Sequence, residues 1–242
     1  MKNETVRPMT DGQRKDVLAT LTQSMPNGIS FEDAKSILGN KGPLVSDLRH
    51  TIEKYMPSSL VNQQLLAWQK VYRDHFNIEL GSVTIPAHRK GFDRLIVVAK
   101  GITIEQAYDA CAKLFTCWRS TDRNLDEAIP TNDRTPVNGS YAIWVRDRIE
   151  ADNELKNLSA NDLKAKGIEL ITLRERIIME LEYFEKTGGH LDIENITLCA
   201  GSRSIFGGVP SADWDGDEFY IGVGWCSPGY AVGSLRARQV AS

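Results

Sequence analysis

Residues 201–233, GSRSIFGGVPSADWDGDEFYIGVGWCSPGYAVG, give the clearest indication of the fold. This stretch holds eight of the chain's 19 glycines, and Asp215-Gly216 lies between the apolar segments 209–214 and 219–225. An Asp-Gly pair flanked in this way predicts a β-hairpin with a two-residue turn. Because side chains alternate along a strand, we expect one face of the second segment to point inward. That inward face comprises Phe219, Ile221, Val223 and Trp225, and the opposite face comprises Tyr220, Gly222, Gly224 and Cys226.

The segments around the hairpin extend it to an α+β domain over residues 78–242. Residues 94–99, 141–145, 193–199 and 235–240 are strand candidates, and 78–85 alternates in part. Helices are predicted over 103–118 and 172–187, each opened by a capping box, Thr103 with Gln106 and Thr172 with Glu175. Gly188-Gly189 ends the second helix, and the polar residues 120–139 read as a long loop. Helices that precede the hairpins are typical of α+β proteins.

The first 77 residues show only helical patterns. Helices are predicted over 11–25, 30–39, 43–56 and 59–76, and Ser30 is a suitable N-cap for the second of them. We therefore expect a small N-terminal helical bundle over residues 1–77.

Composition and charge exclude several classes of protein. The chain has 242 residues, 41% hydrophobic and 25% charged, with a net charge of −3. These proportions are those of a globular protein, and nothing in the charge calls for a polyanion or a membrane as partner. The N-terminus lacks the apolar stretch of a secretory signal, and the longest apolar run, 95–99, is too short to cross a bilayer. We expect a cytoplasmic protein with four reduced cysteines, while surface display by another route stays open.

Few residues have the pattern of a catalytic or metal site. The four histidines are scattered, and none has metal-ligand spacing with another His or Cys. Asp213, Asp215 and Asp217 alternate, but an EF-hand opened at Asp213 would need Gly where Glu218 stands. An enzyme that uses His190, Cys199 and the serines of 202–204 is the least favoured hypothesis. The sequence predicts no catalytic residues, no metal and no cofactor.

The N-terminal helices leave one alternative function open. Residues 1–77 carry ten Lys or Arg and eight Asp or Glu, with no basic stripe, so a nucleic-acid partner is disfavoured. The helix pair 31–38 and 43–56 is nevertheless compatible with a helix-turn-helix. The alternative is therefore a nucleic-acid-associated or regulatory protein that acts through residues 26–77.

The most unusual feature of the chain is the composition of residues 204–237. This stretch contains one Glu and no Lys, Gln or Met, although the whole chain has 13 Lys, 15 Glu, 7 Gln and 5 Met. Gly, Ser, Ala, Asp, Tyr, Val, Ile and Phe fill it instead, and all of these are reachable from an asparagine codon by replacing its adenines. Tryptophan and arginine positions between them have the character of a framework set by packing or charge.

This pattern resembles the variable proteins of diversity-generating retroelements, which carry a C-terminal variable region on a C-type-lectin-like fold. The chain is also similar to uncharacterised proteins of small-genome, uncultivated bacteria that end in a like Trp/Arg framework. The residues that carry the resemblance are 198–203 (LCAGSR), Val209-Pro210, Trp214, Trp225, Pro228 and 235–238 (LRAR). The calcium-sugar motifs of true lectins are absent, and LRAR replaces the family's common Gly-Phe-Arg ending.

The resemblance implies a non-catalytic binding module with a diversified surface over residues 204–237. Small residues together with Tyr and Asp make an antibody-like contact surface, so the expected ligand is a protein surface. The alternative is an ordinary glycine-rich β-sheet domain in which residues 204–237 vary no more than the rest of the chain. The candidate ligand-binding residues are Ser204, Ile205, Phe206, Ser211, Asp215, Asp217, Tyr220, Ser227, Tyr230, Val232 and Ser234.

Overall fold

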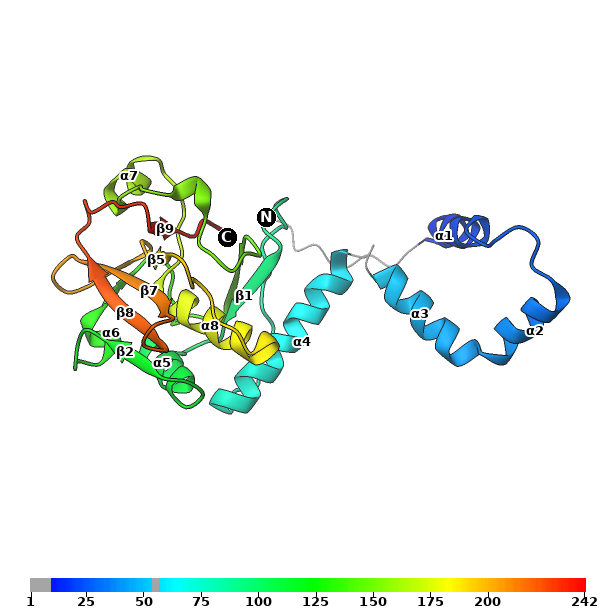
Figure 1. The fold of residues 1–242 in the computed structure, drawn as a ribbon, viewed down its shortest axis with the longest axis horizontal. Coiled ribbons are helices and arrows are strands. Elements are labelled where there is room, and N and C mark those ends of the chain that lie inside the picture. Colours follow the sequence, from blue (N-terminus) through cyan, green and yellow to red (C-terminus); the bar gives the residue numbers. More distant parts are fainter. Residues whose placement is uncertain (1–9, 54–56) are drawn as a thin grey trace. The chain divides into compact units, whose positions relative to one another are not determined.

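The computed structural model describes residues 10–53 and 57–242 and divides the chain into two compact units, Met1–Pro57 and Ser58–Ser242 (Figure 1). The division lies N-terminal to the boundary expected after residue 77, because helix α4 (Pro57–Phe76) packs on the second unit. Trp68 Nε1 donates to the Leu95 carbonyl at 2.9 Å, and the Tyr72 hydroxyl donates to the Val97 carbonyl at 2.7 Å. Both tyrosine and tryptophan are buried, so α4 is part of that core.

The first unit contains helices α1 (Asp11–Gln23), α2 (Phe31–Gly39) and α3 (Lys41–Glu53), as the sequence predicts. Ser30 caps α2, and its hydroxyl accepts from the Asp33 N–H at 3.1 Å. The described residues of these three helices bury no side chain, and Phe31 is 80% exposed. The helices predicted for this segment are thus confirmed, whereas their packing into a bundle stays a prediction.

The second unit is a mixture of helices and strands, with its hairpins at the C-terminal end. Its further helices are α5 (Ile104–Ala112), α6 (Leu125–Ala128), the 3₁₀ helix η1 (Asn153–Leu155), α7 (Ala160–Ala165) and α8 (Leu173–Thr187). Its strands are β1 (Arg94–Val98), β2 (Cys117–Arg119), β3 (Thr131–Asn132), β4 (Tyr141–Val145), β5 (Ile196–Leu198), β6 (Ser202–Arg203), β7 (Val209–Asp215), β8 (Tyr220–Cys226), β9 (Leu235–Ala237) and β10 (Val240–Ala241). An α+β architecture is thus confirmed in its coarse form.

The strands form three sheets. An antiparallel sheet of order β1-β4-β10 joins the end of the chain to the first strand of this unit. The principal sheet has the order β2-β8-β7-β5-β9, with β2 parallel to β8 and β9 parallel to β5. A short β3-β6 ladder completes the set. The principal sheet therefore brings residues near 118 beside the glycine-rich hairpin.

The predicted helix caps are confirmed. The Thr103 hydroxyl accepts from the Gln106 N–H at 3.0 Å, and the Thr172 hydroxyl accepts from the Glu175 N–H at 3.3 Å. Gly188 ends α8 at a φ of 70°, a left-handed conformation that glycine adopts at no steric cost.

The helix predicted over 103–118 is wrong in its second half. Helix α5 ends at Ala112, and residues 117–119 form β2, which places Cys117 in the sheet. The Thr116 carbonyl accepts from the Ile221 N–H at 3.0 Å, and the Ser120 N–H donates to the Val223 carbonyl at 3.0 Å. Pairing with a strand distant in sequence thus overrides the local helical pattern.

The loop predicted over 120–139 and the partial strand pattern of 78–85 also need correction. The segment 120–139 contains α6 and β3 rather than loop alone, whereas 78–85 forms no strand and only packs Ile78, Leu80, Val83 and Ile85 against the core. The two together show that polar composition hides short elements, and that partial alternation is not enough for a strand.

The hairpin predicted around Asp215-Gly216 is confirmed, but the predicted two-residue turn is wrong. Asp215 pairs with Tyr220, so the connection runs over the four residues 216–219. Asp215 Oδ1 accepts from the N–H groups of Asp217 and Glu218 at 2.9 and 3.0 Å, which closes the wider turn. Phe219 takes a φ of 58° in this turn and is 67% exposed, so it is not part of the inward face.

Two hydrophobic clusters lie on the two faces of the principal sheet. The larger includes Ala212 and Val223 with α4, α5, α8 and the β1-β4-β10 sheet. The smaller includes Leu198 and Val209 with residues 155–170 and 235–237. Gly201 lies at their junction, where an added Cβ would stand 2.5 Å from the Leu170 carbonyl oxygen. Only glycine fits this position without displacing the backbone.

Candidate functional site

A groove of about 530 Å³ opens where β8 ends. Three segments line it: the end of β8 with residues 227 and 228, the loop that follows β2, and the loop between β6 and β7. Its lining residues are Ser120, Thr121, Arg123, Ala128, Ser204, Ile205, Phe206, Gly208, Trp225, Cys226, Ser227 and Pro228. The volume is in the range of ligand-binding pockets.

The first wall of the groove comprises residues 120–128. The Glu105 carboxylate holds both ends of its loop, because it accepts from Arg119 Nη1 at 2.7 and 2.8 Å and from the Leu125 N–H at 2.7 Å. Asn124 then caps α6 by accepting from the Asp126 N–H at 2.9 Å. A short loop fixed at both ends presents its side chains in a defined arrangement.

The second wall comprises residues 204–208. Its turn is closed by Ser204, whose N–H donates to the Gly208 carbonyl at 2.8 Å and whose carbonyl accepts from the Gly207 N–H at 2.9 Å. The Ile205 N–H donates to the Ala128 carbonyl at 3.0 Å, which ties the second wall to the first. The backbone of the groove is therefore held by main-chain bonds, so side chains at 205 and 206 do not determine it.

The end of β8 closes the groove. Trp225 is half-buried and packs against the larger core, while burial raises the pKa of the neighbouring Cys226 thiol. The Pro228 carbonyl accepts from the Asn161 N–H at 3.0 Å, which attaches this end to α7.

The structure brings some of the predicted ligand-binding residues together and separates others. Ser204, Ile205, Phe206 and Ser227 line the groove. Asp215, Asp217 and Tyr220 lie at the hairpin turn, at the opposite end of β8 and about 20 Å away at the usual rise per residue of a strand. Tyr230, Val232 and Ser234 lie in the loop between β8 and β9.

Two of these residues do not present free side chains. Ser211 is only 7% exposed, and Val232 packs against the smaller hydrophobic cluster. The alternation of β7 does place Ser211 opposite Gly224, but the neighbouring layers cover that position.

Four large apolar side chains of the stretch 204–237 are instead strongly exposed. Their exposed fractions are 42% for Ile205, 87% for Phe206, 67% for Phe219 and 50% for Tyr230. Aromatic side chains exposed in this way are typical of binding surfaces, where they supply contact area at a low cost in conformational entropy.

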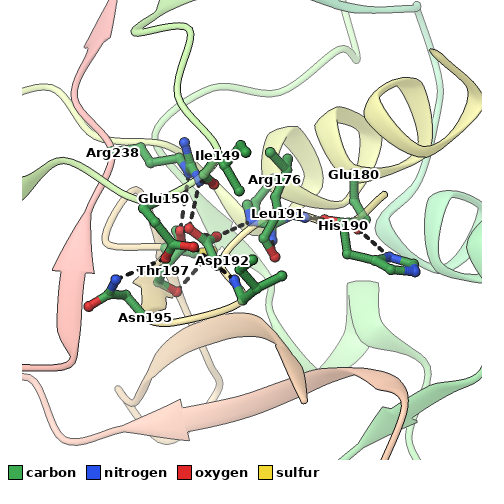
Figure 2. Close-up of polar contacts among 12 residues, drawn as sticks. Ile149, Glu150, Arg176, Glu180, His190, Leu191, Asp192, Asn195, Thr197 and Arg238 are labelled. Carbon is green, nitrogen blue, oxygen red and sulfur yellow. Dashed lines mark hydrogen bonds and ion pairs between the residues drawn. The ribbon is translucent and has the colours of Figure 1, made fainter. Parts of the chain in front are cut away.

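A buried polar network connects α8 with β5 and with the residue that follows β9. We call it the Asp192 network and define it as Arg176, Glu180, His190, Asp192, Thr197 and Arg238 (Figure 2). Asp192 accepts from Arg176 Nε at 2.8 Å and from Arg238 Nη2 at 2.6 Å, while Arg176 Nη1 also donates to Glu180 at 2.7 Å. The two arginines, Asp192 and Glu180 are almost completely buried. The network thus joins α8 to the strands that begin and end the hairpin region.

The charges of the network compensate one another. Burial alone would lower the pKa of Arg176, but Asp192 and Glu180 raise it above its ordinary value. Burial lowers the pKa of Arg238, and the neighbouring Arg176 charge adds to this effect. Asp192 therefore supplies the counter-charge for the buried Arg238 guanidinium.

His190 extends the network to the surface. Its Nδ1 lies 2.9 Å from Glu180 Oε1, and its ring stacks on Trp214 at 3.5 Å with an interplanar angle of 3°. Trp214 is thereby fixed by stacking at the end of β7.

The residues of the enzyme hypothesis have other partners in the structure. Cys199 is buried, and this burial raises the pKa of its thiol far above the ordinary range. The Ser202 hydroxyl accepts from the Leu173 N–H at 3.0 Å and donates to Asn132 at 2.7 Å, so it links the start of α8 to β3. Within residues 10–53 and 57–242, no hydrogen bond links His190 to either of them.

In comparisons with protein-family models, curated proteins and solved structures, nothing matched this chain. Across the part of the chain that the structure describes, no helix is both long and apolar enough to cross a bilayer. In the same residues, no three His, Cys, Asp or Glu side chains gather as metal ligands would.

Sequence reasoning missed the first wall of the groove. Ser120, Thr121 and Arg123 lie in a polar segment with no motif or periodicity, and only the parallel pairing of β2 with β8 brings them to residues 204–206.

Proposed function

We propose that this chain is a ligand-binding protein whose C-terminal unit resembles the C-type-lectin-like domain of retroelement-diversified variable proteins. The ligand is a protein surface, bound by exposed side chains of residues 204–237. The placement of the helices before the antiparallel β7–β8 hairpin supports this proposal.

One observation carries the proposal. Ile205, Phe206, Phe219 and Tyr230 are exposed within a stretch whose backbone is held by main-chain hydrogen bonds and by buried framework side chains. Such side chains can be exchanged without cost to the core, and this separation of framework from surface is what a diversified binding protein requires.

The test is to sequence the gene across its source population and compare codons 190–242 with codons 92–190. The expected substitutions cluster at adenines of a nearby template repeat and fall on exposed positions such as 205, 206 and 230. Trp214, Trp225 and Arg236 should stay unchanged. Trp214 is held by stacking on His190, Trp225 packs against the larger core, and Arg236 lies in strand β9. Equal variation in the two codon ranges would overturn the proposal and leave a glycine-rich α+β domain without a diversified surface.

A further inference from the structure

The two walls of the groove differ in their relation to the diversified stretch. Ser120, Thr121 and Arg123 stand outside residues 204–237, whereas Ser204, Ile205, Phe206 and Ser227 stand inside them. We infer that the first wall, whose residues do not vary, binds an acidic side chain of the protein ligand. The second wall then selects the ligand residues next to that acidic side chain. This inference rests on the proposed function and deepens it.

The charge of the groove favours an acidic side chain. Arg123 is the one charged residue among those that line the groove, although the chain as a whole has a net charge of −3. Its side chain is exposed, and the described residues offer its guanidinium no ion pair or hydrogen bond. A guanidinium binds a carboxylate through two parallel N–H···O bonds, which gives direction as well as charge.

The nearby Arg119 shows the contrast. Its guanidinium is occupied, since it binds both oxygens of Glu105 and lies 4.9 Å from the centre of the Tyr108 ring. Arg119 therefore has a structural role in the first wall, whereas the Arg123 guanidinium is available to a ligand.

Hydroxyl groups in the same groove lining can complete the coordination of a carboxylate. The Arg123 N–H donates to Thr121 Oγ1 at 3.2 Å, which leaves the hydroxyl proton of Thr121 available as a donor. Ser120, Ser204 and Ser227 add three further hydroxyls to the lining. A carboxylate accepts up to four hydrogen bonds, so this donor-rich lining suits it.

The second wall suits apolar neighbours of that carboxylate. Ile205 and Phe206 are exposed, and Trp225 forms a half-buried aromatic surface beside them. Because side chains at 205 and 206 do not determine the loop's backbone, their exchange would change the preferred apolar neighbour and leave Arg123 in place.

The experiment is a selection of random heptapeptides displayed on phage against the full chain. The same library is selected in parallel on Arg123→Gln, on Phe206→Ser and on the control Arg89→Gln, which changes an exposed arginine outside the groove lining. We expect Asp and Glu to be enriched in peptides selected by the unchanged chain, by Phe206→Ser and by Arg89→Gln. Arg123→Gln should lose that enrichment, and Phe206→Ser should alter only the apolar residues next to the acid.

Affinity measurements on one selected peptide then quantify the contact. Fluorescence anisotropy should show a loss of about tenfold or more on Arg123→Gln, since a hydrogen bond to a charged group contributes on this scale. A Glu→Gln change in the peptide should cause the same loss on the unchanged chain and almost none on Arg123→Gln.

The outcomes separate the inference from the proposed function. Enriched peptides without Asp or Glu, or an acidic preference that survives Arg123→Gln, would overturn the inference and leave the binding function standing. A selection that enriches no peptide on any variant would count against the binding function itself.

Discussion

The substitution Asp192→Asn should strongly destabilise the second unit. Asp192 is buried between Arg176 and Arg238, and it adopts a φ of 56°. Asn tolerates this left-handed conformation about as well as Asp, so the substitution removes the charge without straining the backbone. The amide presents an NH₂ group to one guanidinium, leaves Arg176 with Glu180 as its remaining bonded acid, and removes the ion-pair partner of Arg238.

The expected cost follows from this geometry. Removal of one partner from a buried ion pair destabilises a protein by about 3–5 kcal/mol. For a domain of this size, that free energy corresponds to a fall in Tm of roughly 6–20 °C.

Urea unfolding followed by tryptophan fluorescence is a suitable assay, because the chain's 5 tryptophans all lie in the second unit. Asp217→Asn is the matched control, since Asp217 is exposed in the hairpin turn and only its backbone N–H is bonded. The control should change the free energy of unfolding by less than about 0.5 kcal/mol. An Asp192→Asn variant as stable as this control would refute the reasoning that the network holds the fold together.

Two further predictions concern Asp213 and Tyr72. Burial raises the pKa of Asp213 to about 6 in the folded chain from an ordinary value of 3.8, so its ionisation opposes folding as the pH rises through this interval. Asp213→Asn should therefore raise Tm above about pH 7 and have little effect near pH 3; a constant difference across this range in thermal unfolding would contradict the assignment. The Tyr72 hydroxyl donates to the Val97 carbonyl and accepts from the Ala99 N–H at 3.1 Å in the core, so Tyr72→Phe should cost about 1–3 kcal/mol in urea unfolding. Tyr230→Phe, at an exposed position, should cost almost nothing, and equal costs for the two variants would show that α4 does not depend on this contact.

Local chemistry made much of the architecture predictable. The capping boxes at Thr103 and Thr172 and the glycine stop at Gly188 located three helix ends correctly, because each depends on residues within a few positions of one another. The hairpin around Asp215-Gly216 was predictable for the same reason.

Predictions failed where distant segments compete for the same residues. Residues 113–118 have a helical pattern, yet the parallel pairing of β2 with β8 takes Cys117 out of any helix. Phe219 fits the alternation of an inward face, yet the carboxylate of Asp215 closes a wider turn that turns Phe219 outward.

The same distinction between local pattern and tertiary pairing applies to the candidate site. The unusual composition of 204–237 and the Trp/Arg framework could be recognised without a structure, because both are properties of residue types in order along the chain. The three-dimensional arrangement was needed to show that Arg123 and Phe206 line one groove, that Ser211 is covered, and that Arg238 is bound to Asp192. These relations depend on strand order and on the packing of layers, which bring together residues that no local pattern connects.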